Sequence, residues 1–183
     1  MLPYDGQALL YPEFAIHIAM EDVRDEVSWV EESIRLFGKV HKVPRLIAYY
    51  GDVGYQYSGV WHPAVPMPQV LSQLQRKIAE VVDFTFNSVL CNYYRHGMDG
   101  MGYHRDNEPE LDASCIASLS FGTRRRFRMR HRRTKESVAM ELGQGDLLIM
   151  LDCQDEWEHA IPKTKKPCGE RINLTYRRIF EAS

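Results

Sequence analysis

The stretch Arg171-Ile172-Asn173-Leu174-Thr175-Tyr176-Arg177 alternates polar and apolar residues without a break. In an extended strand, successive side chains point to opposite faces, so the four polar residues share one face and the three apolar residues the other. The apolar face predicts packing against a core. The polar face carries two arginines, which are costly to bury unless anions meet them. This segment therefore predicts a strand whose polar face is either solvated or built to bind an anion.

Other segments of the second half read in the same way. They are short, apolar or alternating, and bounded by Gly, Asp, Asn or Pro. Together with the last strand, the predicted strands cover residues 86–94, 115–121, 126–130, 137–141, 146–151 and 171–179. Many short strands with no helical pattern between them favour an antiparallel sandwich or barrel, and a double-sheet jelly roll fits best.

The first half predicts two flanking helices with a different texture between them, so the fold class is mainly β with helices, or α+β. Valine and isoleucine recur at helical spacing from Asp22 to Leu36, and leucine, isoleucine and valine do so from Pro68 onward. The core-facing positions are Val23, Val27, Val30 and Ile34 in the first helix, and Leu71, Leu74, Ile78 and Val81 in the second. Residues 38–68 interleave Gly and Pro with aromatics, which indicates hairpins that either display a recognition surface or pack a small β-layer.

Composition limits the class of protein. The chain has 183 residues, 44% of them hydrophobic and 26% charged, which is typical of one globular domain rather than a disordered tail. A net charge of −2 predicts no general affinity for nucleic acids or membranes. The four cysteines form no C-x-x-C motif, and no apolar stretch is long enough to span a bilayer. We expect a cytoplasmic protein (nuclear in a eukaryote) with no membrane partner.

The first chemical signal is the triplet His104-Arg105-Asp106. Its imidazole and carboxylate stand at i and i+2, so an extended segment presents both on one face. His159, downstream of the predicted strand 146–151, offers a third ligand. Two histidines and one carboxylate form the facial set that suits non-haem Fe(II) with open positions. Taken alone, an H-x-D triplet also arises by chance. The other histidines lack such a partner and are predicted to be structural or exposed: His17, His41, His62, His96 and His131.

Two further patterns accompany this triplet. Arg171 and Arg177 suit the bidentate binding of a dicarboxylate such as 2-oxoglutarate. Asn92 and Tyr94, at i and i+2 near the end of an apolar strand, are placed to hydrogen-bond a carboxylate from one sheet face. The alternative for this pair is an ordinary polar pair on an edge strand.

The combined pattern resembles the AlkB-type Fe(II)/2-oxoglutarate-dependent dioxygenases. The resemblance covers roughly residues 30–180 and rests on an ordered set of motifs: Asn92-x-Tyr94, His104-x-Asp106, His159 and Arg171-x-Asn173-x-Thr175-x-Arg177. Pro44-Arg45, Tyr50-Gly51-Asp52, Tyr57-Ser58-Gly59 and the stretch 118–122 are similar to the subgroup of the mammalian duplex-DNA repair paralogues.

The resemblance implies a double-stranded β-helix core at residues 86–183, with helices and a nucleotide-recognition lid at 1–85, all in one monomeric domain. It implies that His104, Asp106 and His159 hold Fe(II), with O₂ as a co-substrate. The residues it places around 2-oxoglutarate are Asn92, Tyr94, Arg171, Asn173, Thr175 and Arg177. The implied reaction is oxidative demethylation of N-alkylated bases in DNA, such as 1-methyladenine and 3-methylcytosine, which releases formaldehyde and succinate.

The resemblance also implies contacts to the substrate. Phe37, Gly38 and Lys39 match a finger that enters the duplex, although Phe37 equally suits a position that caps the first helix. The segment Tyr55-Gln56-Tyr57 matches the lining of the pocket for the flipped base. Asn107 and Glu108 follow the metal-binding aspartate at positions that are usually acidic, and Asn107 departs from the more common Asp. That departure weakens the expected contact to a cationic base.

The sequence also contains a cluster of arginines. It comprises Arg124, Arg125, Arg126, Arg128, Arg130, Arg132 and Arg133. Period-two alternation puts Arg126, Arg128 and Arg130 on one face, opposite Phe127 and Met129, and such a patch is typical of contacts to a phosphate backbone. The alternative is a solvated strand balanced by glutamates. Two other functions also stay open: the same oxidation of RNA or of a protein side chain, and a catalytically silent module that binds nucleic acid.

Overall fold

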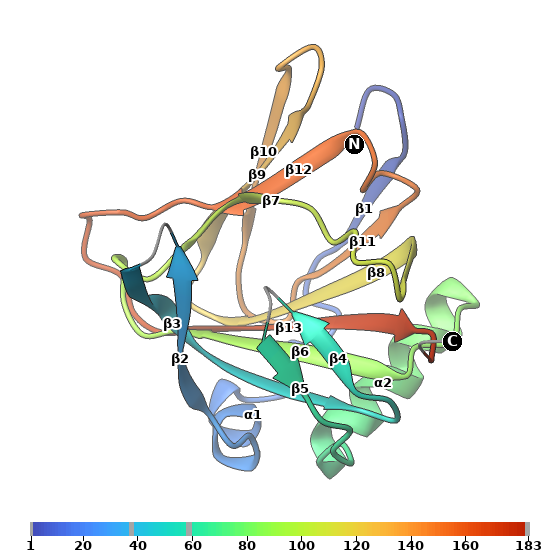
Figure 1. The fold of residues 1–183 in the computed structure, drawn as a ribbon, viewed down its shortest axis with the longest axis vertical. Helices are drawn as coiled ribbons and strands as arrows, with labels where there is room; N and C mark the ends of the chain where they lie inside the picture. Colours follow the sequence, from blue (N-terminus) through green and yellow to red (C-terminus); the bar gives the residue numbers. More distant parts are fainter. Residues whose placement is uncertain (1, 37–38, 58–59, 182–183) are drawn as a thin grey trace.

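In the computed structural model, which describes residues 2–36, 39–57 and 60–181, two antiparallel sheets face each other (Figure 1). The larger has the strand order β1-β11-β8-β13-β6-β3-β2, the smaller β10-β9-β12-β7, and β4 pairs with β5. The strands are β1 (Gln7–Tyr11), β2 (Val30–Leu36), β3 (Lys39–Gly51), β4 (Tyr55–Tyr57), β5 (Val60–His62), β6 (Ser88–Tyr94), β7 (Met101–His104), β8 (Leu111–Gly122), β9 (Arg125–His131), β10 (Ser137–Leu142), β11 (Leu147–Leu151), β12 (Trp157–Ile161) and β13 (Arg171–Ile179). This arrangement confirms the predicted jelly roll.

Strand β13 lies inside the larger sheet, hydrogen-bonded to β6 on one side and β8 on the other. Its alternation is confirmed. Ile172, Leu174 and Tyr176 pack into the core on the helix-covered face. Its polar residues face the opposite way, toward the space between the sheets, and are also buried. The alternative of a solvated polar face is therefore wrong.

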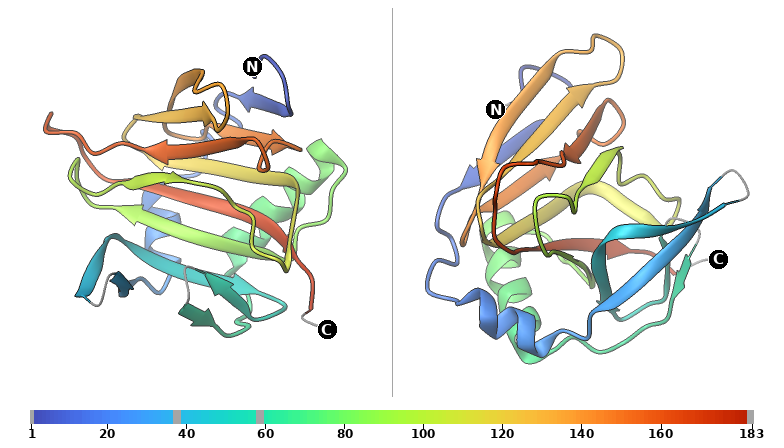
Figure 2. Two further views of the ribbon diagram at one scale, coloured as in Figure 1. Left: turned by 45° about the horizontal axis from the view of Figure 1, so that its top comes forward. Right: turned by 90° about the vertical axis from the view of Figure 1, so that its left-hand side faces the viewer.

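Two helices cover the outer face of the larger sheet (Figure 2). Helix α2 (Gln69–Val82) begins directly after Pro68, as predicted, and buries Val70, Leu71, Leu74 and Ile78. The prediction for Val81 is wrong, because its side chain is 44% exposed and Val82 packs against the core instead. The helix ends at Asp83, whose backbone is left-handed. None of the helices in the described ranges is long and apolar enough to cross a bilayer.

The predicted helix 22–36 is wrong beyond its first turns. Helix α1 (Met20–Glu26) buries Val23, and its C-cap Val27 has extended backbone angles. The chain then turns into strand β2, where Val30 pairs with Ile47 of β3 and is 56% exposed. The helical spacing of β-branched residues was coincidental, because pairing with β3 decides the conformation and such residues favour strands.

Residues 39–57 and 60–68 contain the strands of the predicted hairpins, β3, β4 and β5. Strand β3 extends the larger sheet at its edge, and the hairpin β4–β5 stands beside it (Figures 1 and 2). The packing interpretation holds for Tyr49, Tyr50 and Tyr55, which are buried, whereas Trp61 is 65% exposed. A recognition role for this segment stays a prediction. Strands β1, β7 and β12 were not predicted.

Candidate metal and co-substrate site

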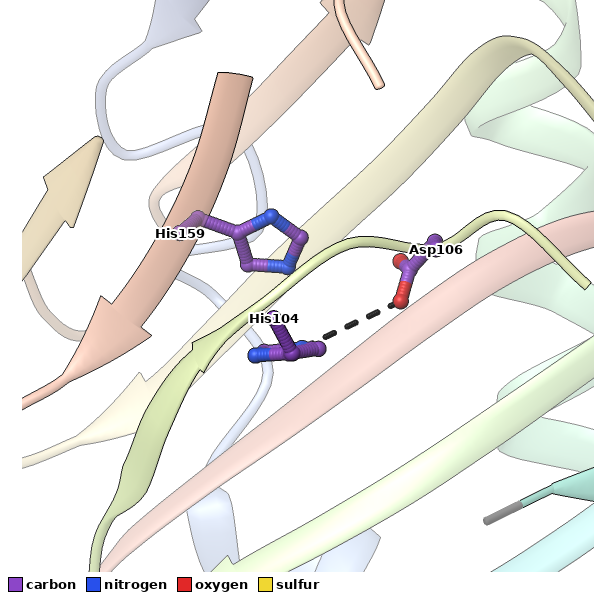
Figure 3. A group of neighbouring side chains, drawn as sticks. All are labelled: His104, Asp106 and His159. Atoms are coloured by element: carbon purple, nitrogen blue, oxygen red, sulfur yellow. Dashed lines mark ion pairs between the residues drawn. The ribbon is translucent and has the colours of Figure 1, made fainter. Parts of the chain in front are cut away.

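Three predicted ligands meet where β7 and β12 pair (Figure 3). His104 is the last residue of β7 and lies directly opposite His159 of β12, while Asp106 follows two residues beyond the strand. Their ligand atoms all lie within 4.8 Å of one another, and His104 Nε2 is 3.9 Å from Asp106 Oδ1. The structure thus gathers two imidazoles and one carboxylate, the donor set that suits Fe(II).

The two imidazoles each present a nitrogen for coordination. His104 Nδ1 donates to the Gly102 carbonyl over 2.9 Å, so Nε2 is the unprotonated nitrogen of the neutral ring. His159 is 6% exposed, and its Nδ1 has no hydrogen-bond partner in the described part of the chain. Its ring stacks on Phe127 and meets the His104 ring edge-on. Figure 3 shows the other ring nitrogen of His159, Nε2, on the side of His104 and Asp106, so Nε2 is the nitrogen placed for coordination.

Electrostatics keep these ligands in their metal-binding protonation states. Burial alone would raise the pKa of Asp106, but Arg177 and the two histidines outweigh it and hold this pKa at about 2. Burial lowers the pKa of His159 to about 3, and it also lowers the pKa of His104. Near neutral pH the site therefore offers two neutral imidazoles and a carboxylate, so a metal ion displaces no proton from them.

The predicted co-substrate residues line the same cavity. Arg171 is 1% exposed, and its Nη2 donates to Ser120 Oγ over 2.9 Å. Its Nε and Nη1 have no hydrogen-bond partner among the described residues. Burial lowers the pKa of this guanidinium to about 10, so it remains charged at neutral pH. A buried cation whose donors are only partly satisfied by the protein fits a carboxylate ligand.

The remaining co-substrate residues form a hydrogen-bonded floor beside Arg171. Asn173 donates to Ser118 Oγ over 2.8 Å and accepts from Thr175 Oγ1 over 3.1 Å. Asn92 accepts from Arg45 Nε over 2.6 Å. At the metal end, Arg177 Nη2 lies 2.7 Å from Asp106 Oδ1. Tyr94 is buried, and the Arg171 guanidinium lies 5.3 Å from its ring centroid.

Of the predicted substrate residues, Tyr55 and Glu108 lie close to the metal ligands, and the others are either exposed away from the cavity or not described by the structure. Tyr55 is 1% exposed and lies near the Arg177 guanidinium, and burial raises the pKa of its hydroxyl, with Glu108 adding to the rise. One carboxylate oxygen of Glu108 is buried. Gln56 and Asn107 are exposed and do not line this cavity. Phe37 and Gly38 lie outside the described residues, as do the side chains of Lys39 and Tyr57.

The basic cluster is only partly as predicted. Arg126 and Arg128 are exposed opposite the buried Phe127 and Met129, which confirms the alternation. Arg125, however, is buried and donates to the backbone carbonyls of Asp99 and Pro162, so its place in the patch is wrong.

Acidic residues balance part of this cluster, as the alternative expected. Arg126 pairs with Glu141 at 3.2 Å, and Arg130 pairs with Glu158 at 2.5 Å. A groove beside the patch is nevertheless strongly basic. Its charged lining consists of Arg124, Arg125, Arg126, Arg128, Lys163, Lys166 and Glu141.

A second cluster of possible ligands comprises Asp5, His131 and Glu156. The Thr134 backbone N–H donates to His131 Nδ1 over 3.1 Å, so a neutral ring carries its proton on Nε2. That nitrogen lies 3.1 Å from Asp5 Oδ2, a hydrogen bond that ties the N-terminal segment to β9. This geometry makes His131 structural, as predicted, rather than a metal ligand.

Four residues that support the site were not predicted individually from the sequence. Ser118 and Ser120 of β8 support Asn173 and Arg171, and their i, i+2 spacing on an apolar strand was a usable signal. Arg45 and Gln154 carried no local signal, because each is brought to the site by chain segments far from its own.

Comparison with known proteins places these features in a family context. The 2OG-Fe(II) oxygenase superfamily matches residues 8–177 of this chain. The DNA oxidative demethylase ALKBH2 of Mus musculus is 42% identical over an alignment of 159 positions, which covers 80% of this chain and 66% of that protein. The Alpha-ketoglutarate-dependent dioxygenase alkB homolog 3 of Homo sapiens is 35% identical over an alignment of 197 positions, gaps included, which covers 96% of this chain and 67% of that protein.

The fold comparison agrees. The solved structure of OsALKBH1 superposes with a TM-score of 0.67 at 14% identity, and it covers 97% of this chain and 99% of that chain. At this identity the likeness shows the fold alone. The chain spans between 57% and 67% of the length of the ALKBH2 and alkB homolog 3 relatives.

Proposed function

Because the chain belongs to the 2OG-Fe(II) oxygenase superfamily, of the AlkB-type, we propose that it oxidatively dealkylates N-alkylated bases in DNA. The expected products are the repaired base, formaldehyde and succinate. The relatives named DNA oxidative demethylase ALKBH2 support a DNA substrate, and the relatives named Alpha-ketoglutarate-dependent dioxygenase alkB homolog 3 support 2-oxoglutarate as the co-substrate. The observation that carries the proposal is the set of two histidines and an aspartate, of which Asp106 and His159 are buried, beside the buried Arg171 with two donors that lack a protein partner among the described residues.

We propose that His104, Asp106 and His159 hold the iron. When bound, Fe(II) with 2-oxoglutarate and O₂ supplies the oxidant that hydroxylates an N-alkyl carbon. This chain contributes the preset ligand charges, the fixed His104 tautomer and a buried environment, so little reorganisation is needed at the site.

The co-substrate roles follow from charge and burial. Arg171 is proposed to bind the carboxylate of 2-oxoglutarate farther from the metal, through the two donors that lack protein partners. Arg177 lies at the metal end, beside Asp106. Asn92, Tyr94, Asn173 and Thr175 complete the polar lining.

The contacts to the base are proposed from its positive charge, in contrast to the negative charge of the co-substrate. A base such as 1-methyladenine or 3-methylcytosine is cationic, and it is favoured near a carboxylate and a π face. Glu108 and the Tyr55 ring supply these two features at one place next to the metal ligands. The base must leave the duplex stack to reach them, which costs least where methylation has already spoiled pairing.

Contacts to the DNA backbone are proposed for the basic groove. Arg128 has no acidic partner among the described residues, Arg124 has only a pair with Asp146 at 3.9 Å, and Lys163 and Lys166 line the same groove. Phosphates would complete the charge balance there.

The test is a turnover assay. Protein loaded anaerobically with Fe(II) and 2-oxoglutarate is mixed with O₂ and oligonucleotides that contain 1-methyladenine or 3-methylcytosine. Single- and double-stranded forms are compared by mass spectrometry, with His104→Ala as the control. Loss of the methyl mass that depends on 2-oxoglutarate supports the dealkylase.

Two other outcomes count against the proposal. Succinate formation without DNA repair would keep the oxygenase and move the substrate to RNA or protein. No turnover with metal bound would leave the silent nucleic-acid-binding module as the better description.

A further inference from the structure

The three metal ligands are not held in the same way. His104 and His159 sit in paired strands and lie opposite each other in the ladder. Asp106 lies two residues past the end of β7, and residues 105–108 belong to no helix or strand. No ladder hydrogen bond therefore fixes the peptide that carries the only carboxylate of the set.

A single side chain takes the place of that ladder. The Asp106 backbone N–H donates to the side-chain oxygen of Gln154 over 3.1 Å. Gln154 belongs to the turn between β11 and β12, and its own carbonyl accepts from Arg105 Nη1 over 3.4 Å. The ligand-bearing segment is thus fastened to this turn on both sides of the Arg105–Asp106 peptide.

The surroundings of Gln154 show what its amide is for. The residue is 1% exposed, and among the described residues its Nε2 has only Met150 Sδ and Cys153 Sγ as acceptors, both at 3.6 Å. Sulfur is a weak acceptor, so burying this NH₂ group costs free energy that an apolar side chain would avoid. The one strong hydrogen bond of the buried amide is the bond to Asp106.

We propose that Gln154 is a positioning residue that fixes Asp106 for the metal and thereby sets the affinity of the site for a divalent cation. The proposal rests on the proposed iron site. Gln154 does not contact the metal; it holds the backbone from which the carboxylate reaches it, as outer partners of metal ligands generally do.

The chain offers a matched control. Gln144 is a partly buried glutamine whose side chain also bonds backbone groups, accepting from the Gly122 N–H over 2.8 Å and donating to the Ile18 carbonyl over 2.6 Å. It lies among other segments and touches no ligand of the metal. Gln144→Met therefore removes an equivalent amide without changing the metal site.

The experiment measures Mn²⁺ affinity by anaerobic calorimetry on the full chain, without DNA or O₂, together with the melting temperature of each variant. Gln154→Met, nearly isosteric but without the acceptor, should weaken Mn²⁺ binding by about 10-fold or more. Gln144→Met should lower the melting temperature and leave Mn²⁺ affinity unchanged. Gln154→Glu keeps an acceptor oxygen and should restore most of the affinity.

Each outcome is decisive. Unchanged affinity in Gln154→Met, or equal losses in Gln154→Met and Gln144→Met, would overturn the positioning role while the iron site stands. If the wild-type chain binds no Mn²⁺, the proposed metal site fails and the inference fails with it. If Gln154→Met does not fold, Gln154→Asn, whose amide is too short to reach Asp106, should show the same loss.

Discussion

Two regions of the molecule are built differently: the cavity between the two sheets, and the hairpins at the edge of that cavity. Every residue of β6 and all but one of β13 are buried, and the cavity side chains on them bond to protein partners on neighbouring strands. Strand β5 of the edge hairpin has no buried residue, and Trp61 on it is largely exposed. A rigid cavity suits chemistry that needs fixed geometry, whereas an open edge suits recognition of a bulky partner.

The largest expected effect removes a metal ligand from the cavity. Asp106→Ala should lower dealkylation by more than about 100-fold, since changes in outer partners of ligands alone cost 10- to 100-fold. It should also abolish measurable Mn²⁺ binding. Asp112→Ala, a carboxylate on β8 outside the cavity, is the control. Near-normal turnover in Asp106→Ala would break the assignment of the cavity to the chemistry.

Arg171→Met should raise the KM for 2-oxoglutarate by about 100-fold, because two charge-assisted hydrogen bonds are lost at about 1.5 kcal/mol each. Stability should stay equal or rise, since a buried cation with unused donors is replaced by an apolar side chain. Steady-state kinetics and urea unfolding measure the two quantities. Arg178→Met, at the exposed neighbour on the same strand, should change neither. A large loss of stability with unchanged KM would make Arg171 purely structural.

Glu108→Gln tests the substrate contact proposed where the segment after β7 meets Tyr55 of the edge hairpin. It should lower kcat/KM for the cationic 1-methyladenine by about 10-fold, as expected for one hydrogen bond to a charged group. The KM for 2-oxoglutarate should not move, since Glu108 does not line the co-substrate cavity. Competition between a cationic and a neutral alkylated base in one reaction gives the cleanest measurement. Equal losses on both bases would remove charge recognition from the role of Glu108.

The smallest effect concerns pH and stability. The pKa of His159 is about 3, and that of His104 is also lowered by burial, whereas an unfolded histidine titrates near 6.5. Below about pH 6.5 the unfolded chain binds protons that the folded chain does not. The metal-free protein should therefore lose stability as pH falls, by about 1.4 kcal/mol per pH unit for His159, and His104 should change the stability in the same direction.

Urea unfolding at pH 7.5 and 5.5 checks this expectation. His159→Gln should reduce the loss between the two pH values, and His17→Gln, at an exposed position, should not. An identical pH dependence in wild type and His159→Gln would show that His159 is not held neutral in the fold.

Much of the cavity was predictable because it lies on strands. Period-two alternation placed Arg171, Asn173, Thr175 and Arg177 on one face, and the structure confirms that face. The same rule placed Asn92 with Tyr94. Alternation is imposed by backbone geometry within one strand, so no tertiary information is needed to read it.

The strands at the edge of the cavity were harder to predict, because their conformation depends on pairing with another strand. Residues 30–36 looked helical, yet they pair with β3. The spacing of Val30 and Ile34 fits a helix turn, and only pairing with β3, whose partner residues lie 3 to 17 positions away in the chain, decides otherwise. The prediction that Val81 faces the core was also wrong, because helical periodicity does not show at which residue the last turn stops contacting the core.

By itself, the sequence determined the fold class, the ligand types and the faces on which the cavity residues lie, because these depend on residue chemistry and on local backbone periodicity. Only the tertiary structure decided that His159 stands opposite His104, that the Arg171 guanidinium is buried with free donors, and that Gln154 holds Asp106. Those facts arise from strand pairing and packing between segments distant in the chain, which no local pattern encodes.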